Sequence, residues 1–245
     1  MIDKIEKLFQ FISNNRKYNK ALQERYYRSI ILPYKDEKEK IISLLYNIAN
    51  TQSQPKIDNL AEFYKSIITD EHSLKSFKEF VEKINPNGKN NFESVYKGML
   101  NQKGWGSKTS ALISKSIFHL HNGQYSEDLK IWNDVPKLID EKDNFYLPVD
   151  TVIIAIFKKI NPNKNWNFTN INLLLKHKYD GYQIEIWDDL WFWGFITQNG
   201  GKNRKFEWNE NKYWVLKESD KDKMKIEEIK NKCHEFLEIF NCKTE

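Results

Sequence analysis

The chain has 245 residues, of which 39 are Lys or Arg and 34 are Asp or Glu, so its formal charge is +5 at pH 7. This mild positive balance permits binding to nucleic acid without proving it, and lysine suits contact with phosphates better than base reading. An AT-rich genome would give the same lysine and asparagine content, and we give that explanation equal weight. No stretch approaches the ~20 apolar residues of a membrane span, so we expect no membrane segment.

The cysteine and histidine content indicates a compartment and argues against a metal site. Only Cys233 and Cys242 are present, and such a low count favours a reducing compartment. The first residues, Met1 to Lys4, lack the apolar core of a signal peptide, so we expect a cytoplasmic protein. His119 and His121 are two residues apart and would point to different sides of a helix. We therefore predict no metal site.

Apolar residues at helical spacing predict helices along most of the chain, and hence an all-α fold in one domain over residues 1–245. Asp36 and Asp150 are placed as N-caps. Short β segments are expected near the C-terminus, over residues 206 to 216. In chain order the predicted helices cover residues 3–14, 22–31, 36–49, 57–68, 73–84, 92–100, 107–121, 151–160, 171–179, 184–197 and 220–240.

The most informative stretch is Gly104-Trp105-Gly106-Ser107-Lys108-Thr109, between two predicted helices. Glycine adopts positive φ without a steric clash, so two glycines one residue apart predict a tight hairpin. Residues 92–121 then form a helix, a hairpin and a helix. Because N–H groups at a helix start bind anions, we predict phosphate binding here, with a plain helix–helix turn as the alternative. The phosphate-binding candidates are Gly104, Gly106, Ser107 and Thr109.

This hairpin, read together with Leu147-Pro148-Val149-Asp150-Thr151, resembles the helix-hairpin-helix DNA glycosylase superfamily. The family hairpin carries a lysine two residues after its second glycine in members that also cut the DNA backbone, and Lys108 occupies that place. Lys103 stands where the family usually has proline. The family aspartate lies in an apolar-x-Val-Asp-Thr run at the start of the next core helix, here at Asp150. The likeness covers residues 40 to 200 and implies a two-lobed all-α fold with DNA crossing the hairpin.

The resemblance implies a DNA glycosylase with AP lyase activity that acts through Lys108 and Asp150. A neutral Lys108 would attack C1′ of the damaged nucleotide, expel the base and form a Schiff base that permits β-elimination. A place in the first turn of a helix favours loss of the lysine proton. Asp150 would stabilise cationic character on the sugar and help to deprotonate Lys108. An exposed helix lysine and a structural N-cap are the alternative roles of these two residues.

Three further residues are candidates for a pocket that receives the flipped base. Gln52 ends a segment, residues 44–52, that resembles an early family helix, and its amide can pair with a base edge; a turn residue is an equal alternative. Asp189 and Trp193 are four apart and share a helix face, an acid to accept a purine N–H beside a ring to stack on. Such an aromatic cluster more often forms core. This helix resembles the archaeal-type 8-oxoguanine glycosylase branch, which implies 8-oxoguanine as the lesion.

Residues 122 to 146 form the main departure from the family pattern. Lys108 and Asp150 are 42 residues apart, more than compact members need, so we interpret 122–146 as an insertion; loops that long carry function or are mobile. If this segment belongs to the core, the alignment of Asp150 fails.

The partner implied by the resemblance is double-stranded DNA with a damaged base, bound by a monomer. Cys233 and Cys242 lack the spacing of the four-cysteine iron–sulfur cluster that some branches of the superfamily hold, so we expect no cluster. The family often holds a monovalent cation on the hairpin carbonyls, and the sequence leaves that open. Two other functions remain open. One is a non-catalytic helix-hairpin-helix module that binds duplex DNA, and the other is a helical scaffold for another protein.

Overall fold

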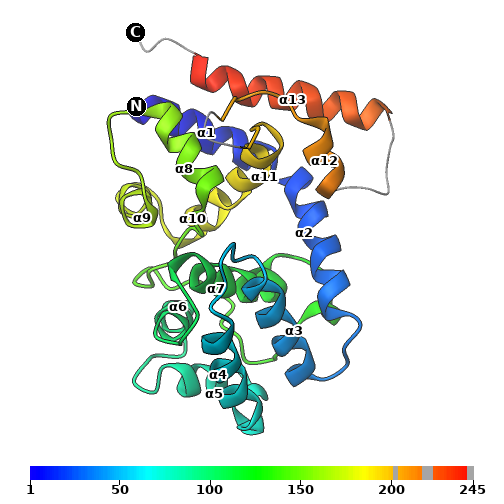
Figure 1. Ribbon diagram of the computed structural model, residues 1–245, viewed down its shortest axis with the longest axis vertical. Coiled ribbons are helices and arrows are strands. Elements are labelled where there is room, and N and C mark those ends of the chain that lie inside the picture. The colour runs from blue at the N-terminus through cyan, green and yellow to red at the C-terminus, as the bar shows by residue number, and fades with distance from the viewer. Residues whose placement is uncertain (201–203, 217–222, 242–245) are drawn as a thin grey trace. The chain divides into compact units, whose positions relative to one another are not determined.

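The computed structural model describes residues 1–200, 204–216 and 223–241, and in these residues the fold is all-α (Figure 1). The extended pairing in this part of the chain is one isolated antiparallel bridge between Gln198 and Phe206. The prediction of short β segments over 206–216 is otherwise wrong, because a helix occupies Glu210–Leu216. Asn209 precedes that helix, and its side chain accepts a hydrogen bond from the Lys212 N–H at 3.1 Å, as an N-cap does.

The helices follow one another in the order that the apolar periodicity predicts. They are α1 (Ile2–Asn14), α2 (Arg16–Ile31), α3 (Glu37–Ala49), α4 (Ile57–Ile68), the short η1 (Glu71–Leu74), α5 (Phe77–Ile84), α6 (Phe92–Leu100), α7 (Ser107–Asn122), the short η2 (Glu127–Leu129), α8 (Thr151–Ile160), α9 (Phe168–Lys176), α10 (Gly181–Trp187), α11 (Asp189–Ile196), α12 (Glu210–Leu216) and α13 (Lys223–Asn241).

Two predicted helices are each divided in the structure. The segment 73–84 separates into η1 and α5, because Ser76 caps α5 by accepting a hydrogen bond from the Glu79 N–H at 3.1 Å. The segment 184–197 separates at Asp188 into α10 and α11. The predicted C-terminal helix 220–240 corresponds to α13, and its residues 220–222 lie outside the described residues.

The chain divides into two compact units, each built from segments distant in sequence. Unit 1 comprises Met1–Leu22, Val149–His177 and Ile186–Glu245, and unit 2 comprises Gln23–Pro148 and Lys178–Glu185. The boundaries fall inside α2 and α10. The prediction of a single domain over 1–245 stays a prediction.

Unit 1 has an aromatic core to which the first and last described helices both contribute. α1 packs against α13, and the Lys4 ammonium donates a hydrogen bond to the Phe240 carbonyl at 2.8 Å (Figure 1). The Phe11 ring lies 5.0 Å from that of Trp193 and 5.5 Å from that of Phe236. Cys233 of α13 is a buried free thiol, and burial raises its pKa. These contacts tie the two ends of the described chain to one core.

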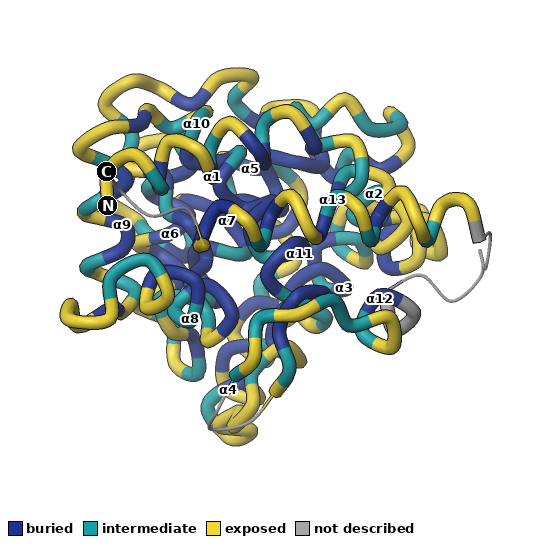
Figure 2. The backbone as a smooth tube through the Cα atoms, turned by 90° about the horizontal axis from the view of Figure 1, so that it is seen from above, coloured by how far each residue is buried: buried dark blue, intermediate teal, exposed yellow. Residues whose placement is uncertain are grey.

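Unit 2 is built around α7, most of which is buried (Figure 2). α7 packs against α6 and α3, and α5 packs against α6. The face that α7 turns inward carries Ile113, Ile117 and Leu120, each 1% exposed or less. The position of α7 therefore fixes where its first turn, with Lys108, comes to the surface.

The 122–146 segment has little helix of its own, yet it contributes to the core of unit 2. The Trp132 indole N–H donates to the Leu74 carbonyl at 2.8 Å, and its ring lies 5.4 Å from that of Phe80. The Asp134 carboxylate accepts hydrogen bonds from the N–H groups of Phe77 and Lys78 at the start of α5. Other buried side chains of the segment are Leu129, Ile131, Val135, Ile139 and Phe145. A segment packed in this way is no simple surface insertion.

Candidate functional site

The hairpin between α6 and α7 needs glycine at its first position. Gly104 has φ +86°, the left-handed region that other residues rarely adopt. A Cβ at Gly104 would also lie 3.0 Å from the Leu60 side chain of α4. The hairpin is held against α4 a second time, because the buried Trp105 ring lies 5.3 Å from the ring of Phe63. The sequence prediction of a tight, glycine-dependent turn is confirmed at Gly104.

Gly106 differs from Gly104, because nothing in the protein requires glycine there. It is the N-cap of α7, with extended backbone (φ −118°, ψ 175°), and a Cβ built on it would meet no atom within 4 Å. The first N–H groups of a helix have no carbonyl partner within it, and glycine has no side chain with which to cap them. The start of α7 therefore presents backbone N–H groups beside open space, which is the geometry that an approaching anion needs.

Lys108 lies in the first turn of α7, and its ammonium meets oxygen atoms that carry no charge. Its Nζ donates to the Thr51 carbonyl at 3.2 Å and lies 3.4 Å from the Thr51 hydroxyl. The neighbouring residue, Gln52, donates from its Nε2 to the Gly104 carbonyl at 3.2 Å. The structure thus brings together the predicted residues Gln52, Gly104 and Lys108.

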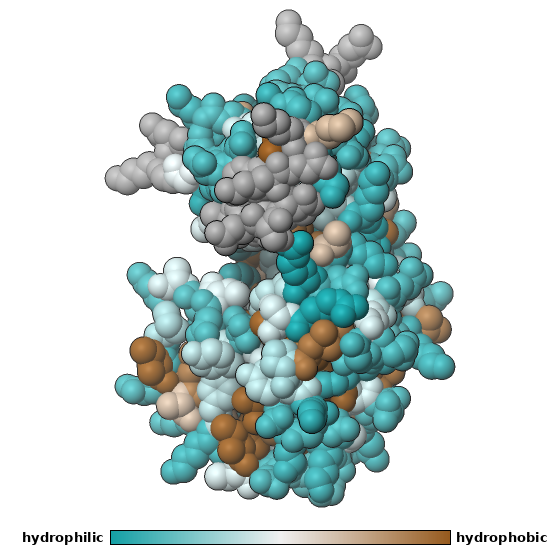
Figure 3. Space-filling view, turned by 90° about the vertical axis from the view of Figure 1, so that its right-hand side faces the viewer, coloured by the Kyte–Doolittle hydropathy of each residue, from teal (hydrophilic) through white to brown (hydrophobic). Residues whose placement is uncertain are grey.

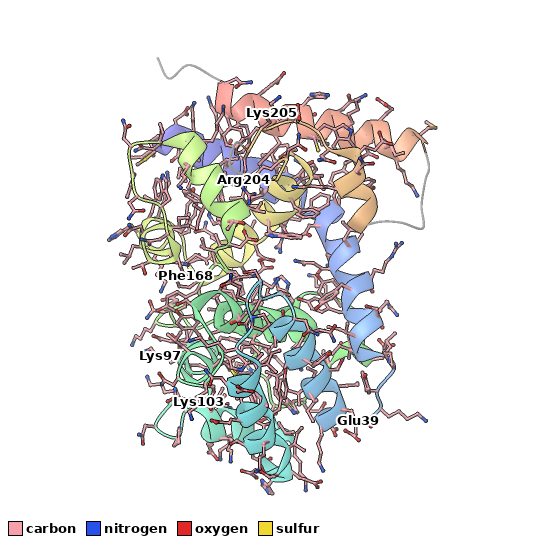
Figure 4. The ribbon with its side chains drawn as sticks, in the orientation of Figure 1. Glu39, Lys97, Lys103, Phe168, Arg204 and Lys205 are labelled. Atoms are coloured by element: carbon pink, nitrogen blue, oxygen red, sulfur yellow. The ribbon has the colours of Figure 1, made fainter. Side chains whose placement is uncertain are left out.

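Other lysines near the hairpin have carboxylate partners, whereas no carboxylate in the described part of the chain pairs with Lys108. Lys103 pairs with Glu62 at 2.7 Å, and Lys97 pairs with Glu93 at 2.7 Å (both lysines are labelled in Figure 4). The Glu62 carboxylate raises the pKa of Lys103 through a hydrogen bond. A lysine held in this way keeps its proton and is a poor nucleophile. Lys108 has no such neighbour.

Asp150 is the N-cap of α8, as the sequence predicts. Its Oδ1 accepts hydrogen bonds from the Val152 N–H at 2.9 Å and the Ile153 N–H at 3.1 Å. Its Oδ2 accepts a hydrogen bond from the Trp191 indole N–H at 2.9 Å. Three donors therefore hold the carboxylate in one orientation. This satisfies a structural role, and it also leaves Oδ2 with a free lone pair for a second partner.

Asp189 and Trp193 are both buried in unit 1, so their placement supports structural roles. The Asp189 carboxylate, 2% exposed, pairs with the Arg16 Nε at 3.0 Å and accepts a hydrogen bond from Asn19 at 2.5 Å. The Trp193 side chain is fully buried and packs edge-on against the rings of Phe11 and Tyr18. A ring enclosed by other rings has no face left for a base. The base-pocket roles of both residues stay predictions without support in this placement.

Two cationic side chains near the start of α8 were not predicted as site residues from the sequence. Arg204, labelled in Figure 4, donates to the Thr151 hydroxyl at 3.0 Å and to Gln198 Oε1 at 3.1 Å. Lys212 of α12 donates to the Gln198 carbonyl and lies 4.9 Å above the Phe195 ring. Neither residue belongs to the glycine hairpin or the Val-Asp-Thr run. The scarcity of arginine was the one available signal, since the chain has 35 lysines and 4 arginines.

The predicted residues fall into both units. Gln52, the hairpin glycines, Ser107, Lys108 and Thr109 belong to unit 2, and Asp150, Asp189 and Trp193 belong to unit 1. The 122–146 segment packs into the core of unit 2, and this packing counts against the alignment of Asp150 with the family aspartate. The remaining support for Asp150 is its place in Val149-Asp150-Thr151 at the start of α8.

The described residues hold no group of three or more His, Cys, Asp or Glu side chains arranged to bind a metal ion. The expected absence of a cofactor stays a prediction. None of the helices in the described part of the chain combines the length and apolar content that crossing a membrane requires. The face in Figure 3 is mostly hydrophilic, with separate hydrophobic side chains.

No protein-family model matches the chain, nor does any curated protein or solved structure. The functional argument therefore rests on the residues and their geometry, together with the resemblance carried by the two motifs.

Proposed function

We propose that the protein is a bifunctional DNA glycosylase and AP lyase that removes an oxidised purine, 8-oxoguanine first among the candidates, through a Schiff base on Lys108. The observation that carries the proposal is the amine of Lys108, which follows a glycine hairpin in the first turn of α7 and pairs with no carboxylate among the described residues. An amine so placed is accessible, lies near the positive end of the helix, and is not held by an acidic side chain as its neighbour Lys103 is.

The chemistry assigned to Lys108 is substitution followed by elimination. The Nζ lone pair forms a bond to C1′ as the bond from C1′ to the base breaks, and the base leaves with that electron pair and gains a proton. Opening of the sugar ring converts the adduct to an imine. Loss of a C2′ proton then expels the 3′ phosphate and cuts the strand. Asp150 is assigned to stabilise positive charge on the sugar.

Binding of the duplex is assigned to the start of α7. The first N–H groups of a helix have no carbonyl partner within it, so we assign those of Ser107 and Thr109 to a phosphate oxygen beside Gly106, where an added Cβ would meet no atom within 4 Å. This contact positions the DNA backbone and reads no sequence. Gln52, whose amide N–H lies on the hairpin carbonyl of Gly104, remains the candidate contact to the flipped base.

The test is borohydride trapping on a duplex with a single 8-oxoguanine opposite cytosine, since reduction of a Schiff base leaves a covalent protein–DNA band. We expect a band from the native chain and from Lys103→Gln, and none from Lys108→Gln. Lys103 is the matched control, because it carries the same charge beside the same hairpin. An equally strong band from Lys108→Gln would assign the nucleophile elsewhere and refute the proposal.

A panel of other lesions follows if native protein gives no band with 8-oxoguanine. Trp193 and Asp189 are buried and form no purine pocket, so the choice of 8-oxoguanine rests on the resemblance alone. Oxidised pyrimidines, alkylated bases, uracil and a bare abasic site complete the panel. A Lys108-dependent band with any of them supports the mechanism and corrects the lesion.

A non-catalytic module that binds duplex DNA is the second candidate. The observation in its favour is that three hydrogen-bond donors already occupy the Asp150 carboxylate. This candidate predicts duplex affinity that falls steeply with salt and no trapped band on any lesion. A helical scaffold for another protein would instead show no DNA binding at moderate salt.

A further inference from the structure

Arg204 and Lys212 converge on Gln198 in unit 1, and among the described residues no carboxylate pairs with either of them. The Arg204 guanidinium donates to the Gln198 side-chain oxygen at 3.1 Å, and the Lys212 ammonium donates to the Gln198 carbonyl. Gln198 is itself fully buried, and its Nε2 donates to the Val152 carbonyl at 3.2 Å. Gln198 is therefore fixed and buried, and its side-chain and main-chain oxygens set the positions of the two cations. No acid in the described residues forms an ion pair with either one.

Bringing these two like charges together carries an electrostatic cost. Burial, and then the positive charge of Arg204, lower the pKa of Lys212. Elsewhere in the described chain lysines commonly lie beside acids, as in the pairs Lys38–Glu71 and Lys83–Asp70. Two uncompensated cations at a partly buried position are stabilised by an anion that binds both.

The surface that continues from these cations leads to Asp150. Arg204 donates to the hydroxyl of Thr151, the residue after Asp150. Lys212 lies over the Phe195 ring, which is stacked on the Trp191 ring at 4.9 Å, and the Trp191 indole bonds to Asp150. The cation pair and the candidate catalytic carboxylate are thus joined by two chains of direct contacts within one unit.

We infer that Arg204 and Lys212 together bind one phosphate of the DNA backbone, adjacent to the nucleotide on which Asp150 acts. The inference rests on the proposed function for the identity of the polyanion. Arginine supplies a planar fork that can contact two phosphate oxygens, and lysine supplies a point charge to the third. The phosphate replaces the missing carboxylate and relieves the repulsion between the two cations.

The test measures how the affinity for an undamaged, fluorescently labelled duplex depends on salt, by anisotropy between about 0.05 and 0.3 M KCl. Loss of one phosphate contact makes the slope of log K against log salt shallower by about 0.9, so a variant that matched native affinity at 1 M salt would bind about eightfold more weakly than native at 0.1 M. We expect this change for the double variant Arg204→Gln with Lys212→Gln. Lys158→Gln is the control for a general effect of lost charge and is compared with Lys212→Gln alone, because each removes one positive charge and Lys158 is exposed at the far end of α8.

Arg204→Lys separates an effect of lost charge from an effect of altered packing, since it keeps the positive charge and changes the hydrogen bonds. We expect it to keep the native slope, while Arg204→Gln loses part of it. Thermal unfolding of each variant by circular dichroism checks that unit 1 is intact. A double variant with the native slope, or a Lys158→Gln slope reduced as much as that of Lys212→Gln, would overturn the inference.

The two proposals fail in different ways. A trapped band that depends on Lys108, with no effect of the double variant on the salt slope, leaves the glycosylase standing and removes the phosphate site. A reduced salt slope in the double variant, without a trapped band on any lesion, supports the phosphate site and refutes the Schiff-base reaction on Lys108. A native chain with no affinity for DNA removes both.

Discussion

At the scale of single residues, Gly104 and Gly106 stand one residue apart and are glycine for different reasons. Gly104 has positive φ and lies against Leu60. Gly106 has ordinary extended backbone and open space beside it. The protein's own folding therefore accounts for the first glycine, whereas no atom of the described structure would meet a Cβ at the second.

Substitution of the two glycines should separate stability from DNA binding. We expect Gly104→Ala to lower the free energy of unfolding by about 1–2 kcal/mol, because alanine is strained at positive φ. Gly106→Ser should leave stability within about 0.5 kcal/mol of native, because serine is a good N-cap, and should weaken duplex binding by filling the open space. Urea unfolding and anisotropy measure the two effects. Native affinity in Gly106→Ser would argue against a phosphate at the start of α7.

Asp150 can be tested for a role beyond capping. Asparagine caps a helix as well as aspartate does, whereas alanine costs about 1–2 kcal/mol. We therefore expect Asp150→Asn to unfold near the native midpoint and to lose the borohydride-trapped band, and Asp150→Ala to lose both stability and the band. Thermal unfolding and trapping are compared on the same preparations. A full band from Asp150→Asn would leave Asp150 with the N-cap role alone.

How well single residues can be predicted depends on whether the cause is local. Gly104 and Asp150 are recognised from sequence because a tight turn and an N-cap depend on a few neighbouring residues. The burial of Trp193 depends on Phe11 and Phe236, which come from opposite ends of the chain. Helical spacing places Trp193 beside Asp189 and does not say whether that face meets solvent or another helix.

At the scale of elements, His121 ties the 122–146 segment to α7. Its Nδ1 lies 2.7 Å from the Ile117 carbonyl, to which it donates as a neutral ring. Its Nε2 accepts hydrogen bonds from the Ile131 N–H at 3.1 Å and the Trp132 N–H at 3.2 Å. A protonated ring cannot accept these bonds. The attachment of the segment therefore depends on the protonation state of one histidine.

The pH dependence of stability should report this attachment. Burial lowers the pKa of His121 from 6.5 to about 4, so the folded protein resists a proton that the unfolded chain binds below pH 6.5. The stability that neutral His121 provides is complete above pH 6.5 and is lost as the pH falls toward 4, by up to about 3 kcal/mol. In His121→Gln, which does not titrate, we expect this component to be missing. Urea unfolding at pH 7, 5.5 and 4 measures it, and parallel pH curves for the two proteins would contradict the assignment.

Helix positions could be predicted because the apolar periodicity is strong, and α4 and α8 have the predicted bounds. The errors arose where a local cap competes with that periodicity. Ser76 divides one predicted helix, and Asn209 begins a helix in a stretch whose aromatic residues favour strand by propensity. The packing of 122–146 could not be foreseen, because its bonds reach Leu74 and Phe77, far away in sequence.

At the scale of the whole molecule, the two candidate catalytic residues come from different units, Lys108 from unit 2 and Asp150 from unit 1. When two residues act in the same chemical step, removing both lowers the rate by much less than the product of the two single effects. We expect Lys108→Gln with Asp150→Asn to excise no more slowly than the worse single variant, in single-turnover measurements. If the losses of excision rate in the two single variants multiply in the double variant, the two residues act in separate steps.

The buried thiol of Cys233 gives unit 1 a chemical reporter. A thiol reagent reacts with the thiolate, and burial both raises the pKa of this thiol and excludes the reagent. Labelling can then proceed only when α13 opens away from α1, at a rate set by that opening. In a Cys242→Ser background, the labelling rate of Cys233 measures how fast unit 1 unfolds locally. If DNA contacts unit 1 through Arg204 and Lys212, bound duplex should slow the labelling of Cys233. This effect requires neither a damaged base nor catalysis.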